Sequence, residues 1–437
     1  MSFMNAPTER HVAIIGAGII GVVSAIEALH DGHRVSIIEP GTPGDVQAAS
    51  YGNAGWLSSH SVIPPAEPGV WRKLPKFLMD PLGPLAIRWS YLPKALPWLI
   101  QYLWSGWTEA KVEETARALR DLLKDAPILH KTLAAEAGLS DLIEHRGVMH
   151  IYPSRAVFEA DKLAWNIRGR VGIAWMELSE DEMRQREPDL DRRYTFGVLV
   201  EEAGRCRDPG AYVAGLAAHA RALGATFISA RATGLKTEQG RLKAVLTDRG
   251  EIACDTAVIA AGVRSKPLCA SIGDRLPLES ERGYHVMIED TGVGPRTSVM
   301  ASDTKMVVNW MNKGLRAAGQ VEIAGLEAAP DWRRADILRD HLMSMFPGLP
   351  KAPPEASVRV WLGHRPSMPD GRPCIGYARA TRDVIYAFGH SHVGLVGAAR
   401  TGRLVAQLIA GRATEIPLGP FDPRRFLLSV ATPESPP

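Results

Sequence analysis

The fold is decided by residues 11–39, HVAIIGAGIIGVVSAIEALHDGHRVSIIE. Residues 11–15 are mostly apolar and β-branched, and this pattern predicts a short buried strand. The strand leads directly into GAGIIG at residues 16–21, and residues 19–30 predict a helix that begins within this glycine-rich motif. Residues 34–38 predict a second strand, so the whole stretch is typical of a nucleotide-binding βαβ unit.

The three glycines of the motif each have a physical reason. Gly16, Gly18 and Gly21 allow a tight turn, a close approach of the backbone to a pyrophosphate, and close packing of the helix on the strand. The helix opens with Ile19 and Ile20, where free N–H groups and the positive end of the helix dipole favour phosphates. The motif therefore predicts binding of a dinucleotide, and both FAD and NAD fit it.

An acidic residue closes the second strand. The carboxylate of Glu39 can accept hydrogen bonds from both ribose hydroxyls of an adenosine, and its charge disfavours a 2′-phosphate, so NADP is not expected. Pro40 follows at the start of a turn. A βαβ unit with a purely structural role is the alternative, because glycines also serve simple turns.

The composition is that of an ordinary globular protein. The chain has 437 residues, which predicts two or three joined domains, with 46% hydrophobic and 23% charged residues. Its net charge of +3 gives no footprint of nucleic-acid binding. No run approaches about 20 apolar residues, so no transmembrane helix is expected.

The four cysteines are scattered and show no C-x-x-C or His/Cys spacing typical of a metal site. We therefore expect reduced thiols and no bound metal, in a protein of the cytoplasm or of the inner face of the cell membrane. Residues 1–10 are polar and lack the apolar segment of a signal peptide, which agrees with this location.

Two further stretches are suited to a bound nucleotide. Residues 48–58, AASYGNAGWLS, are mostly small, as a chain that passes close to a flat ligand must be. A loop without a ligand is the alternative. Residues 256–262, TAVIAAG, predict a buried strand that ends in small residues before a helix near Ser265, which again brings backbone amides close to a nucleotide.

Periodicity predicts the remaining elements. Residues 111–138 and 154–173 predict helical structure with charged faces. Residues 277–290 and 298–322 alternate apolar and polar side chains, as strands of a mixed or antiparallel second sheet do. A helix is predicted over residues 401–409.

These elements predict two domains that are both discontinuous in sequence. The nucleotide-binding domain is expected to comprise residues 1–60, 205–275 and 370–437. The second, substrate-binding domain is expected to comprise residues 61–204 and 276–369.

Residues 64–107 are rich in proline and tryptophan, with basic residues between them. The favoured interpretation is a set of short helices over the second domain, with the tryptophans in its core. A surface that docks on a bilayer or on a partner protein is the alternative. The tryptophans are Trp71, Trp89, Trp98, Trp104 and Trp107.

Seven segments resemble, in the family's order, the FAD-dependent D-amino acid oxidase/dehydrogenase superfamily, most closely its bacterial D-amino acid dehydrogenase branch. They are GAGIIG with Glu39, SYGNAG, DPGAYVAGLAAHA, AVIAAGVRS, ERGYH, WLGHRPSMPDGRPCIG and GHSHVGLVGAARTG. The likeness covers nearly the whole chain. It implies an α/β fold (α+β overall), with a Rossmann-like FAD-binding domain and a mixed-sheet substrate domain of the glycine/D-amino acid oxidase type.

The resemblance implies FAD as the cofactor. The N–H groups that open the last helix would face the N1–C2=O edge of the flavin, where reduced flavin carries negative charge. Ala49 and Val396 lack hydroxyl groups that are common in the family, which bears on flavin tuning rather than on binding. The expected cofactor-binding residues are Gly16, Gly18, Ile19, Ile20, Gly21, Glu39, Pro40, Ser50, Asn53, Ala54, Gly55, Ala261, Gly262, Gly363, Gly394, Leu395 and Val396.

Arg365 is predicted to bind the carboxylate of the substrate, because a guanidinium can grip a carboxylate with two hydrogen bonds. A structural pair with Asp370 is the alternative. Tyr284 and His285 are predicted to line the same cavity; in a regular strand only one of them faces it, and Tyr284 is preferred. His392 is the histidine expected at the active face, with a packing role as its alternative.

The implied reaction is the oxidative deamination of a D-amino acid. A hydride would pass from the substrate Cα to flavin N5, and the resulting imine would hydrolyse to a 2-oxo acid. The electrons would pass to a quinone, another carrier or O₂. Peripheral membrane contact and the oligomeric state stay open, and no nucleic-acid partner is expected.

Three alternatives remain for the function. The substrate could be glycine or a secondary amino acid such as D-proline, hydroxy-D-proline or sarcosine, and the pocket size around Tyr284, Asn309 and Met311 would separate these. The chain could also be the flavoprotein subunit of a larger electron-transfer complex. The third alternative is an NAD-dependent dehydrogenase.

Overall fold

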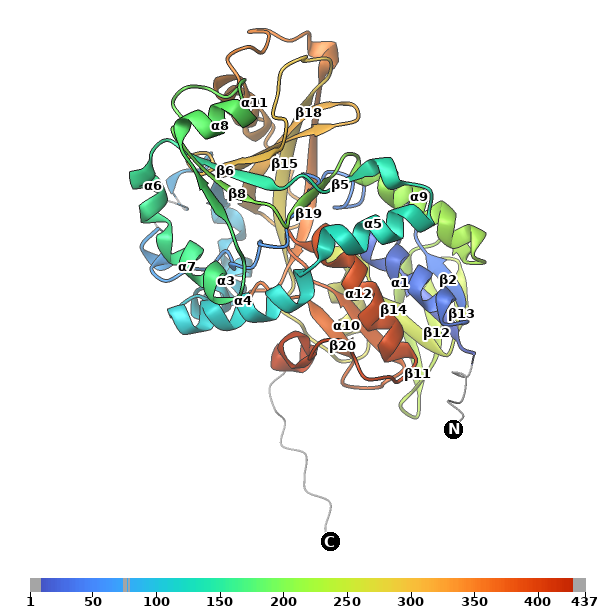
Figure 1. The fold of residues 1–437 in the computed structure, drawn as a ribbon. Coiled ribbons are helices and arrows are strands. Elements are labelled where there is room, and N and C mark those ends of the chain that lie inside the picture. The colour runs from blue at the N-terminus through green and yellow to red at the C-terminus, as the bar shows by residue number, and fades with distance from the viewer. Residues whose placement is uncertain (1–8, 74–76, 78, 427–437) are drawn as a thin grey trace, which may run out of the picture.

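The computed structural model describes residues 9–73, 77 and 79–426 (Figure 1). Its first sheet has six strands, of which five run parallel and the last, β20, runs antiparallel to its neighbour. In sheet order the strands are β10 (Thr226–Ile228), β2 (Arg34–Ile38), β1 (His11–Ile15), β14 (Thr256–Ile259), β21 (Val384–Phe388) and β20 (Cys374–Tyr377).

The βαβ unit predicted from the sequence forms the centre of this sheet. β1 and β2, and the helix α1 (Ile19–His30) between them, have the predicted bounds. Segments far apart in the chain therefore meet here, because β14 and β21 extend the sheet beside β1. The assignment of whole segments to two domains stays a prediction.

The second large sheet is mostly antiparallel, which agrees with the mixed sheet expected from the sequence. β16 pairs in parallel with β6, and β4 pairs in parallel with β18. In sheet order the strands are β19 (Val358–Ser367), β15 (Glu279–Ile288), β18 (Gly314–Ile323), β17 (Met306–Met311), β16 (Ser298–Ala301), β6 (Val148–Tyr152), β8 (Phe196–Val200) and β7 (Met176–Leu178), with β4 (Leu85–Ile87) beside β18.

Two small sheets and the helices complete the fold. One sheet is an antiparallel hairpin of β11 (Ala232–Glu238) and β12 (Arg241–Thr247), extended by β13 (Gly250–Ala253); the other joins β3 (Trp56–Leu57), β9 (Gly204–Cys206) and β5 (Ile143–Glu144). Within the described residues, the other helices with given bounds are α3 (Leu92–Ser105), α4 (Glu109–Leu123), α5 (Ala126–Glu136), α6 (Arg155–Ala160), α7 (Lys162–Arg170), α8 (Glu180–Arg186), α9 (Pro209–Ala222), α10 (Ser265–Ala270), α11 (Arg333–Met345) and α12 (Gly394–Ile409).

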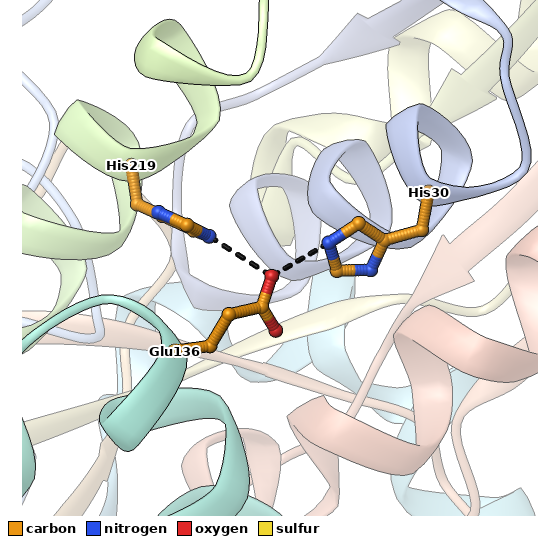
Figure 2. A group of neighbouring side chains, drawn as sticks. All are labelled: His30, Glu136 and His219. Atoms are coloured by element: carbon orange, nitrogen blue, oxygen red, sulfur yellow. Dashed lines mark hydrogen bonds and ion pairs between the residues drawn. The ribbon is translucent and has the colours of Figure 1, made fainter.

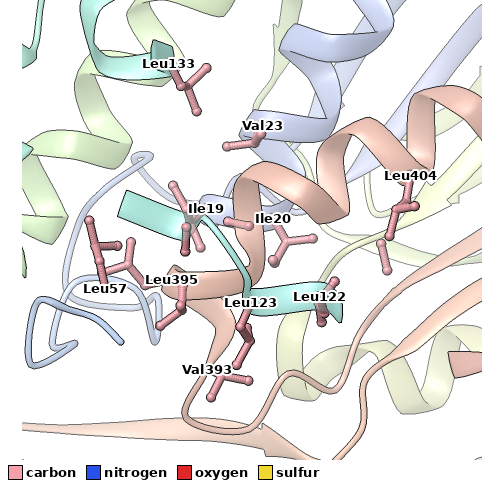
Figure 3. Close-up of a cluster of buried hydrophobic side chains, with 14 of the residues drawn as sticks. Ile19, Ile20, Val23, Leu57, Leu122, Leu123, Leu133, Val393, Leu395 and Leu404 are labelled. Atoms are coloured by element: carbon pink, nitrogen blue, oxygen red, sulfur yellow. The ribbon is translucent and has the colours of Figure 1, made fainter. Parts of the chain in front are cut away.

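Helices α1 and α12 lie side by side over the first sheet, and α4 and α5 pack against them (Figure 1). Figure 3 shows part of the shared core, with Ile19 of α1, Leu123 of α4, Leu133 of α5 and Leu395 of α12 all buried. Burial of such side chains contributes about 1.5–3 kcal/mol each. This core fixes the N-terminal ends of α1 and α12 relative to one another.

Three predicted helical stretches differ from the structure. The stretch 154–173 is divided into α6 and α7 at Asp161. The helical stretch 111–138 is divided into α4 and α5, because Asp125 adopts a left-handed conformation (φ 61°) and Pro127 then opens the next helix. The last helix begins at Gly394 rather than at Thr401. Its first turn therefore reaches the residues that the family resemblance had placed near the flavin.

The favoured interpretation of residues 64–107, with all tryptophans in the core of the second domain, was wrong. Trp98 is buried in a small core with Leu99 and Tyr102, but the other four tryptophans of the segment, Trp71, Trp89, Trp104 and Trp107, are all exposed. The segment therefore covers part of the second sheet and also presents a large apolar surface. Among residues 9–73, 77 and 79–426, no helix combines the length and apolarity needed to cross a bilayer.

Candidate active site

A cavity of about 1080 Å³ is bounded by both large sheets. Its walls come from the ends of β1, β14 and β21, from the first turns of α1 and α12, and from strands β15, β18 and β19 of the second sheet. This volume slightly exceeds the usual range for ligand sites, about 300–1000 Å³, so it has room for a dinucleotide and a small substrate together.

The glycine motif opens into this cavity. Gly16 has φ +106°, and a Cβ there would lie 2.6 Å from the carbonyl oxygen of Ala260. A Cβ on Gly18 would meet only the Ser50 hydroxyl, at 3.7 Å. Gly18 therefore leaves the backbone at the mouth of α1 open on its cavity side, as the predicted approach of a pyrophosphate requires.

Glu39 lies beside this turn with its carboxylate held in place. The backbone N–H of Ala17 donates to Oε2 and that of Gly41 to Oε1, each at 3.0 Å. A carboxylate accepts about four hydrogen bonds, so both oxygens keep the capacity to accept ribose hydroxyls. Pro40 continues the same wall.

The small-residue stretch forms a loop that crosses the cavity. The Ser50 hydroxyl accepts from the N–H of Ile19 at 3.2 Å, which attaches the loop to the first turn of α1. Behind the loop, Nη1 of the buried Arg316 donates to the carbonyl oxygens of Tyr51 (3.2 Å) and Asn53 (2.7 Å). Burial lowers the pKa of Arg316 to about 10, which still leaves it charged at neutral pH.

Helix α12 points its N-terminal end into the cavity through Gly394, Leu395 and Val396. No side chain caps its first N–H groups, and its first turn carries no acidic residue. The first turn of α1 also carries no acidic residue, and the N–H of Ile19 is the one bonded to the Ser50 hydroxyl. Uncapped N–H groups and the positive ends of two helix dipoles therefore face one space, which favours anionic groups there.

The residues around this cavity fit FAD. The open glycine turn and the α1 N-terminus suit a pyrophosphate, Glu39 suits a ribose, and the α12 N-terminus suits the electron-rich edge of a flavin. Ile20, Ala54, Ala261, Gly262 and Gly363, which the sequence assigned to the cofactor, also line the cavity.

Two of the predicted cofactor residues serve the backbone instead. A Cβ on Gly21 would collide with the carbonyl of Gly16, so Gly21 permits the packing of α1 on β1. Gly55 has φ +75° and its Cα faces the Cys206 carbonyl. Gly55 therefore shapes the loop next to β3 rather than the cavity wall.

The guanidinium of Arg365 lies directly over Gly283 of the neighbouring strand. A Cβ on Gly283 would overlap the guanidinium carbon, so this glycine provides the space for it. Nη1 of Arg365 donates to the carbonyl oxygen of Gln320 at 3.0 Å. A guanidinium has five N–H donors, so the group is anchored and still equipped to bind a carboxylate.

The alternative role for Arg365, a structural pair with Asp370, is not what the structure shows. Both oxygens of Asp370 receive hydrogen bonds from other arginines. Nε of Arg372 donates to Oδ2 at 3.0 Å, and the guanidinium of Arg425 donates to both oxygens at 2.8 and 3.3 Å. These two partners hold the pKa of Asp370 below its usual value despite burial.

Tyr284 and His285 lie on opposite faces of β15, as strand geometry requires, and of the two it is Tyr284, the preferred residue, that is among those lining the cavity. Tyr284 borders the cavity, yet its hydroxyl donates to Glu322 Oε2 at 2.8 Å and accepts from the N–H of Asp331. His285 shares the face of Arg365, where its ring stacks on Trp361 and its Nδ1 lies 3.2 Å from the Gly52 carbonyl oxygen. The Tyr284 hydroxyl is therefore occupied by protein partners, whereas His285 lies against the loop that carries Gly52.

His392 lies on the cavity wall at the entrance to α12, and its exposed surface faces that cavity. Desolvation and the nearby charge of Arg365 lower the pKa of His392 to about 4. The neighbouring His390 also borders the cavity, but its Nε2 lies 3.0 Å from the Thr401 hydroxyl. His392 is therefore the neutral imidazole with freedom to contact a ligand.

Asn309 and Met311 do not set the pocket size as expected. The side-chain amide of Asn309 donates to the Ala54 carbonyl at 3.2 Å and its oxygen accepts from Ser298 at 3.0 Å. The Met311 side chain packs near Gly55. Both residues support the loop from the side away from the cavity.

Two residues of the site were missed from the sequence. Glu281 is buried, borders the cavity and lies opposite Arg365 in the β15–β19 pair. The ring of Trp361 occupies the space above two glycines, Gly52 and Gly363, and its Nε1 donates to the Val46 carbonyl at 2.9 Å. The two glycines were a usable signal, since each lies where a side chain would collide with that ring.

A family model described as DAO, FAD dependent oxidoreductase, matches residues 11–408. The chain belongs to this family. It is an FAD-dependent oxidoreductase, and the cavity described above has the features that such a cofactor needs.

Members of the DAO family with curated names resemble the chain over nearly its whole length. It is 72% identical over 421 residues to a D-amino-acid oxidase of Bradyrhizobium diazoefficiens, which covers 96% of this chain and 100% of that protein. It is 28% identical over 420 residues to a D-amino acid dehydrogenase of Rhizobium rhizogenes, covering 95% and 99% of the two chains. The glycine oxidase structure from Geobacillus kaustophilus shares the fold, with a TM-score of 0.71, 23% identity and coverage of 95% and 98%.

Proposed function

We propose that this enzyme oxidises D-amino acids to 2-oxo acids and ammonia. The observation that carries the proposal is the anchored guanidinium of Arg365 over Gly283, in the same cavity as the two helix N-termini that suit FAD. The D-amino-acid oxidase of B. diazoefficiens, at 72% identity, supports the substrate class.

In this proposal the residues of the chain hold the substrate rather than react with it. Arg365 binds the substrate carboxylate, which orients the Cα–H bond toward the cofactor. Bound FAD supplies a two-electron acceptor for the hydride that leaves Cα. His392, neutral at neutral pH because its pKa is lowered to about 4, offers a hydrogen-bonding imidazole without repelling the amine.

The products follow from the atom balance. Loss of a hydride from Cα and a proton from the amine gives an imine, and water converts the imine to a 2-oxo acid and ammonia. A substrate whose amine is part of a ring, such as D-proline, would give a cyclic imine instead. We propose O₂ as the electron acceptor, reduced to hydrogen peroxide, in line with the oxidase name of the 72% identical relative.

The test is an anaerobic titration of the yellow holoenzyme with D- and L-amino acids, glycine, sarcosine and D-proline. Bleaching of the flavin band by D-amino acids supports the proposal, and bleaching only by the other substrates overturns it. Arg365→Ala should abolish bleaching at moderate substrate concentration. Arg359→Ala is the matched control, because Arg359 lies on the same strand but is exposed and pairs with Glu289.

Readmission of air after the anaerobic titration tests which electron acceptor the reduced flavin uses. Readmission of air should restore the yellow colour within the turnover time and release one peroxide per substrate. Slow recovery in air with fast recovery on adding a soluble quinone would assign the enzyme as a dehydrogenase.

One observation favours a second candidate property, peripheral contact with a membrane. Leu96, Ile100 and Trp104 form one stripe of α3 at helical spacing, and the side chains of Ile100 and Trp104 are 59% and 64% exposed. The opposite stripe, with Trp98 and Leu99, is buried. Because α3 has apolar side chains on both faces and only one face is buried, the exposed face can contact another surface.

The side chains around this stripe are suited to an anionic lipid bilayer, because they combine tryptophans with basic residues. Trp71, Trp89 and Trp107 extend the exposed apolar area, and Arg72 and Lys94 are exposed beside it. Tryptophan with basic residues suits the interface of anionic lipids. We propose that the enzyme acts in the cytoplasm and binds the inner face of the membrane through this segment.

Sedimentation with vesicles of anionic lipid tests this contact. The wild-type chain should sediment with the vesicles, and Ile100→Ser with Trp104→Ser should stay in solution. Ile128→Ser is the control, because Ile128 is also exposed but lies on α5, outside the segment. Equal sedimentation of all three proteins, or of none, would overturn the contact.

A further inference from the structure

Three helices end at one point on the surface, and each brings one potential metal ligand there. His30 is the last residue of α1, Glu136 is the last residue of α5, and His219 lies in the last turn of α9. Figure 2 shows both imidazoles directed at the same carboxylate. These residues are far apart in the sequence, so no short spacing typical of metal ligands indicates that they meet.

The ligand atoms are already close together. Nε2 of His30 lies 2.6 Å and Nε2 of His219 lies 3.1 Å from Oε1 of Glu136, and all three atoms lie within 4.8 Å of one another. Ligand atoms around a tetrahedral zinc ion with bonds of about 2.0–2.1 Å are roughly 3.3 Å apart. A small opening of the cluster is therefore enough to admit an ion.

The electrostatics of the place favour a cation. The C-terminal end of a helix carries a partial negative charge, and here three such ends meet. The carboxylate of Glu27 is close enough to interact electrostatically with His30 and Glu136, and Asp31 in turn interacts with Glu27. Arg403 lies 3.8 Å from Glu27 and Arg412 pairs with Asp31, so these two carboxylates are partly offset while Glu136 stays directed at the histidines.

We propose that His30, Glu136 and His219 form a binding site for a divalent transition-metal ion, with Zn²⁺ as its best fit. The two imidazoles are borderline ligands that suit zinc and disfavour Mg²⁺ and Ca²⁺, and zinc also accepts the carboxylate as a third ligand. His30 and Glu136 are each 38% exposed, so water completes the coordination. The site lies outside the cavity wall, and its role is structural.

A metal ion here would join the helix that carries the glycine motif to two helices from later parts of the chain. α1 packs against α9 and α12, and α12 packs against α5. Binding to the folded state alone would raise its stability according to the ion concentration and its affinity. The proposal does not depend on the substrate or on the electron acceptor.

The first test is isothermal titration of metal-free holoenzyme with ZnCl₂ in a buffer that does not chelate. The expected result is one saturable site per chain that MgCl₂ in excess does not displace. His30→Gln and His219→Gln should each weaken this binding at least about tenfold, because even partners that only orient a ligand contribute 10–100-fold. His145→Gln is the matched control, since His145 is also exposed and bonds a backbone carbonyl elsewhere.

A second measurement separates loss of the site from loss of the fold. Without zinc, the His219→Gln variant should keep the flavin spectrum and a Tm close to that of the wild type. With zinc, the Tm should rise in the wild type and in His145→Gln but not in the His219 variant. Absence of saturable binding, or equal binding by the His219 and His145 variants, would overturn the proposal.

Discussion

Glu281 and Arg365 lie directly opposite one another on the antiparallel strands β15 and β19. Directly opposite side chains in such a pair share one face of the sheet, and both of these residues border the cavity. Burial lowers the pKa of Arg365 and raises that of Glu281, while each charge favours the ionised form of the other. A substrate carboxylate bound by Arg365 therefore enters a space that already holds one acidic group.

The first prediction concerns the repulsion between Glu281 and a carboxylate bound by Arg365. At neutral pH, Glu281→Gln should bind a simple carboxylate such as propionate about tenfold more tightly, a difference of about 1.4 kcal/mol, because one negative charge is removed beside Arg365. The advantage should shrink as the pH falls toward the ordinary Glu value of 4.5, since the raised pKa of Glu281 makes the wild-type side chain neutral as well.

Perturbation of the flavin absorbance during a propionate titration measures this affinity. Glu289→Gln is the control, because Glu289 follows the same strand and pairs with the exposed Arg359. An affinity that is unchanged in Glu281→Gln, or that rises equally in both variants, would contradict the prediction.

The second prediction concerns Gly283. Gly283→Ala should push the Arg365 guanidinium out of place, and a displacement of about 1 Å in a positioning group can cost about 10²-fold in kcat/KM. FAD content should stay at the wild-type level. Steady-state kinetics with a D-amino acid measure the effect, and Gly234→Ala serves as control, since a Cβ there makes only ordinary contacts at 3.6 Å. If Gly283→Ala keeps wild-type kinetics, Arg365 does not bind the substrate carboxylate as proposed.

The third prediction separates two glycines of the nucleotide motif. Gly18→Ala should fold normally but bind FAD at least about tenfold more weakly, because its Cβ would occupy the open side of the turn. Gly16→Ala should lower the free energy of unfolding by roughly 1–3 kcal/mol, because φ is +106° and the Cβ meets Ala260.

Fluorescence titration of the apoproteins with FAD and thermal unfolding without FAD measure these two effects separately. Equal losses of apoprotein stability in both variants would mean that Gly18 is as structural as Gly16.

The fourth prediction concerns pH dependence. The pKa of His392 is lowered to about 4, so its imidazole is neutral above that value and does not change charge between about pH 6 and pH 9. The pH profile of kcat/KM in that range should therefore keep its shape in His392→Asn, even if its height falls. An ionisation that disappears with His392 would show that the imidazole titrates during turnover.

Local physics made the nucleotide unit predictable. β1, α1, β2 and Glu39 lie within one short stretch, so glycine sterics and apolar periodicity were sufficient. Pro127 was a usable sequence signal for the break between α4 and α5, whereas the left-handed conformation of Asp125 leaves no strong local signal. The exposed face of α3 was missed for a related reason, since both faces are apolar and only the tertiary fold decides which one is covered.

The site itself was predictable only in part. Arg365 and His392 came from family motifs, and their positions at the cavity agree with those motifs. Glu281 was missed because its importance arises from its register with Arg365 on another strand. Tyr284 borders the cavity as expected, but the hydrogen bond from its hydroxyl to Glu322, on a third strand, was not visible in the sequence. Contacts of this kind depend on strand pairing that the sequence does not display.

The strand order of the first sheet also sets the time at which the enzyme can acquire its cofactor during synthesis. β1 emerges from the ribosome first, but its neighbour β14 and the strand beyond it, β21, come from the middle and the end of the chain. The N-terminus of α12 follows later still. At about 5–20 residues per second, the glycine turn waits for tens of seconds beside an unpaired strand edge. The cavity that suits FAD is thus complete only after β21 and the N-terminus of α12 have been made, long after the glycine turn itself.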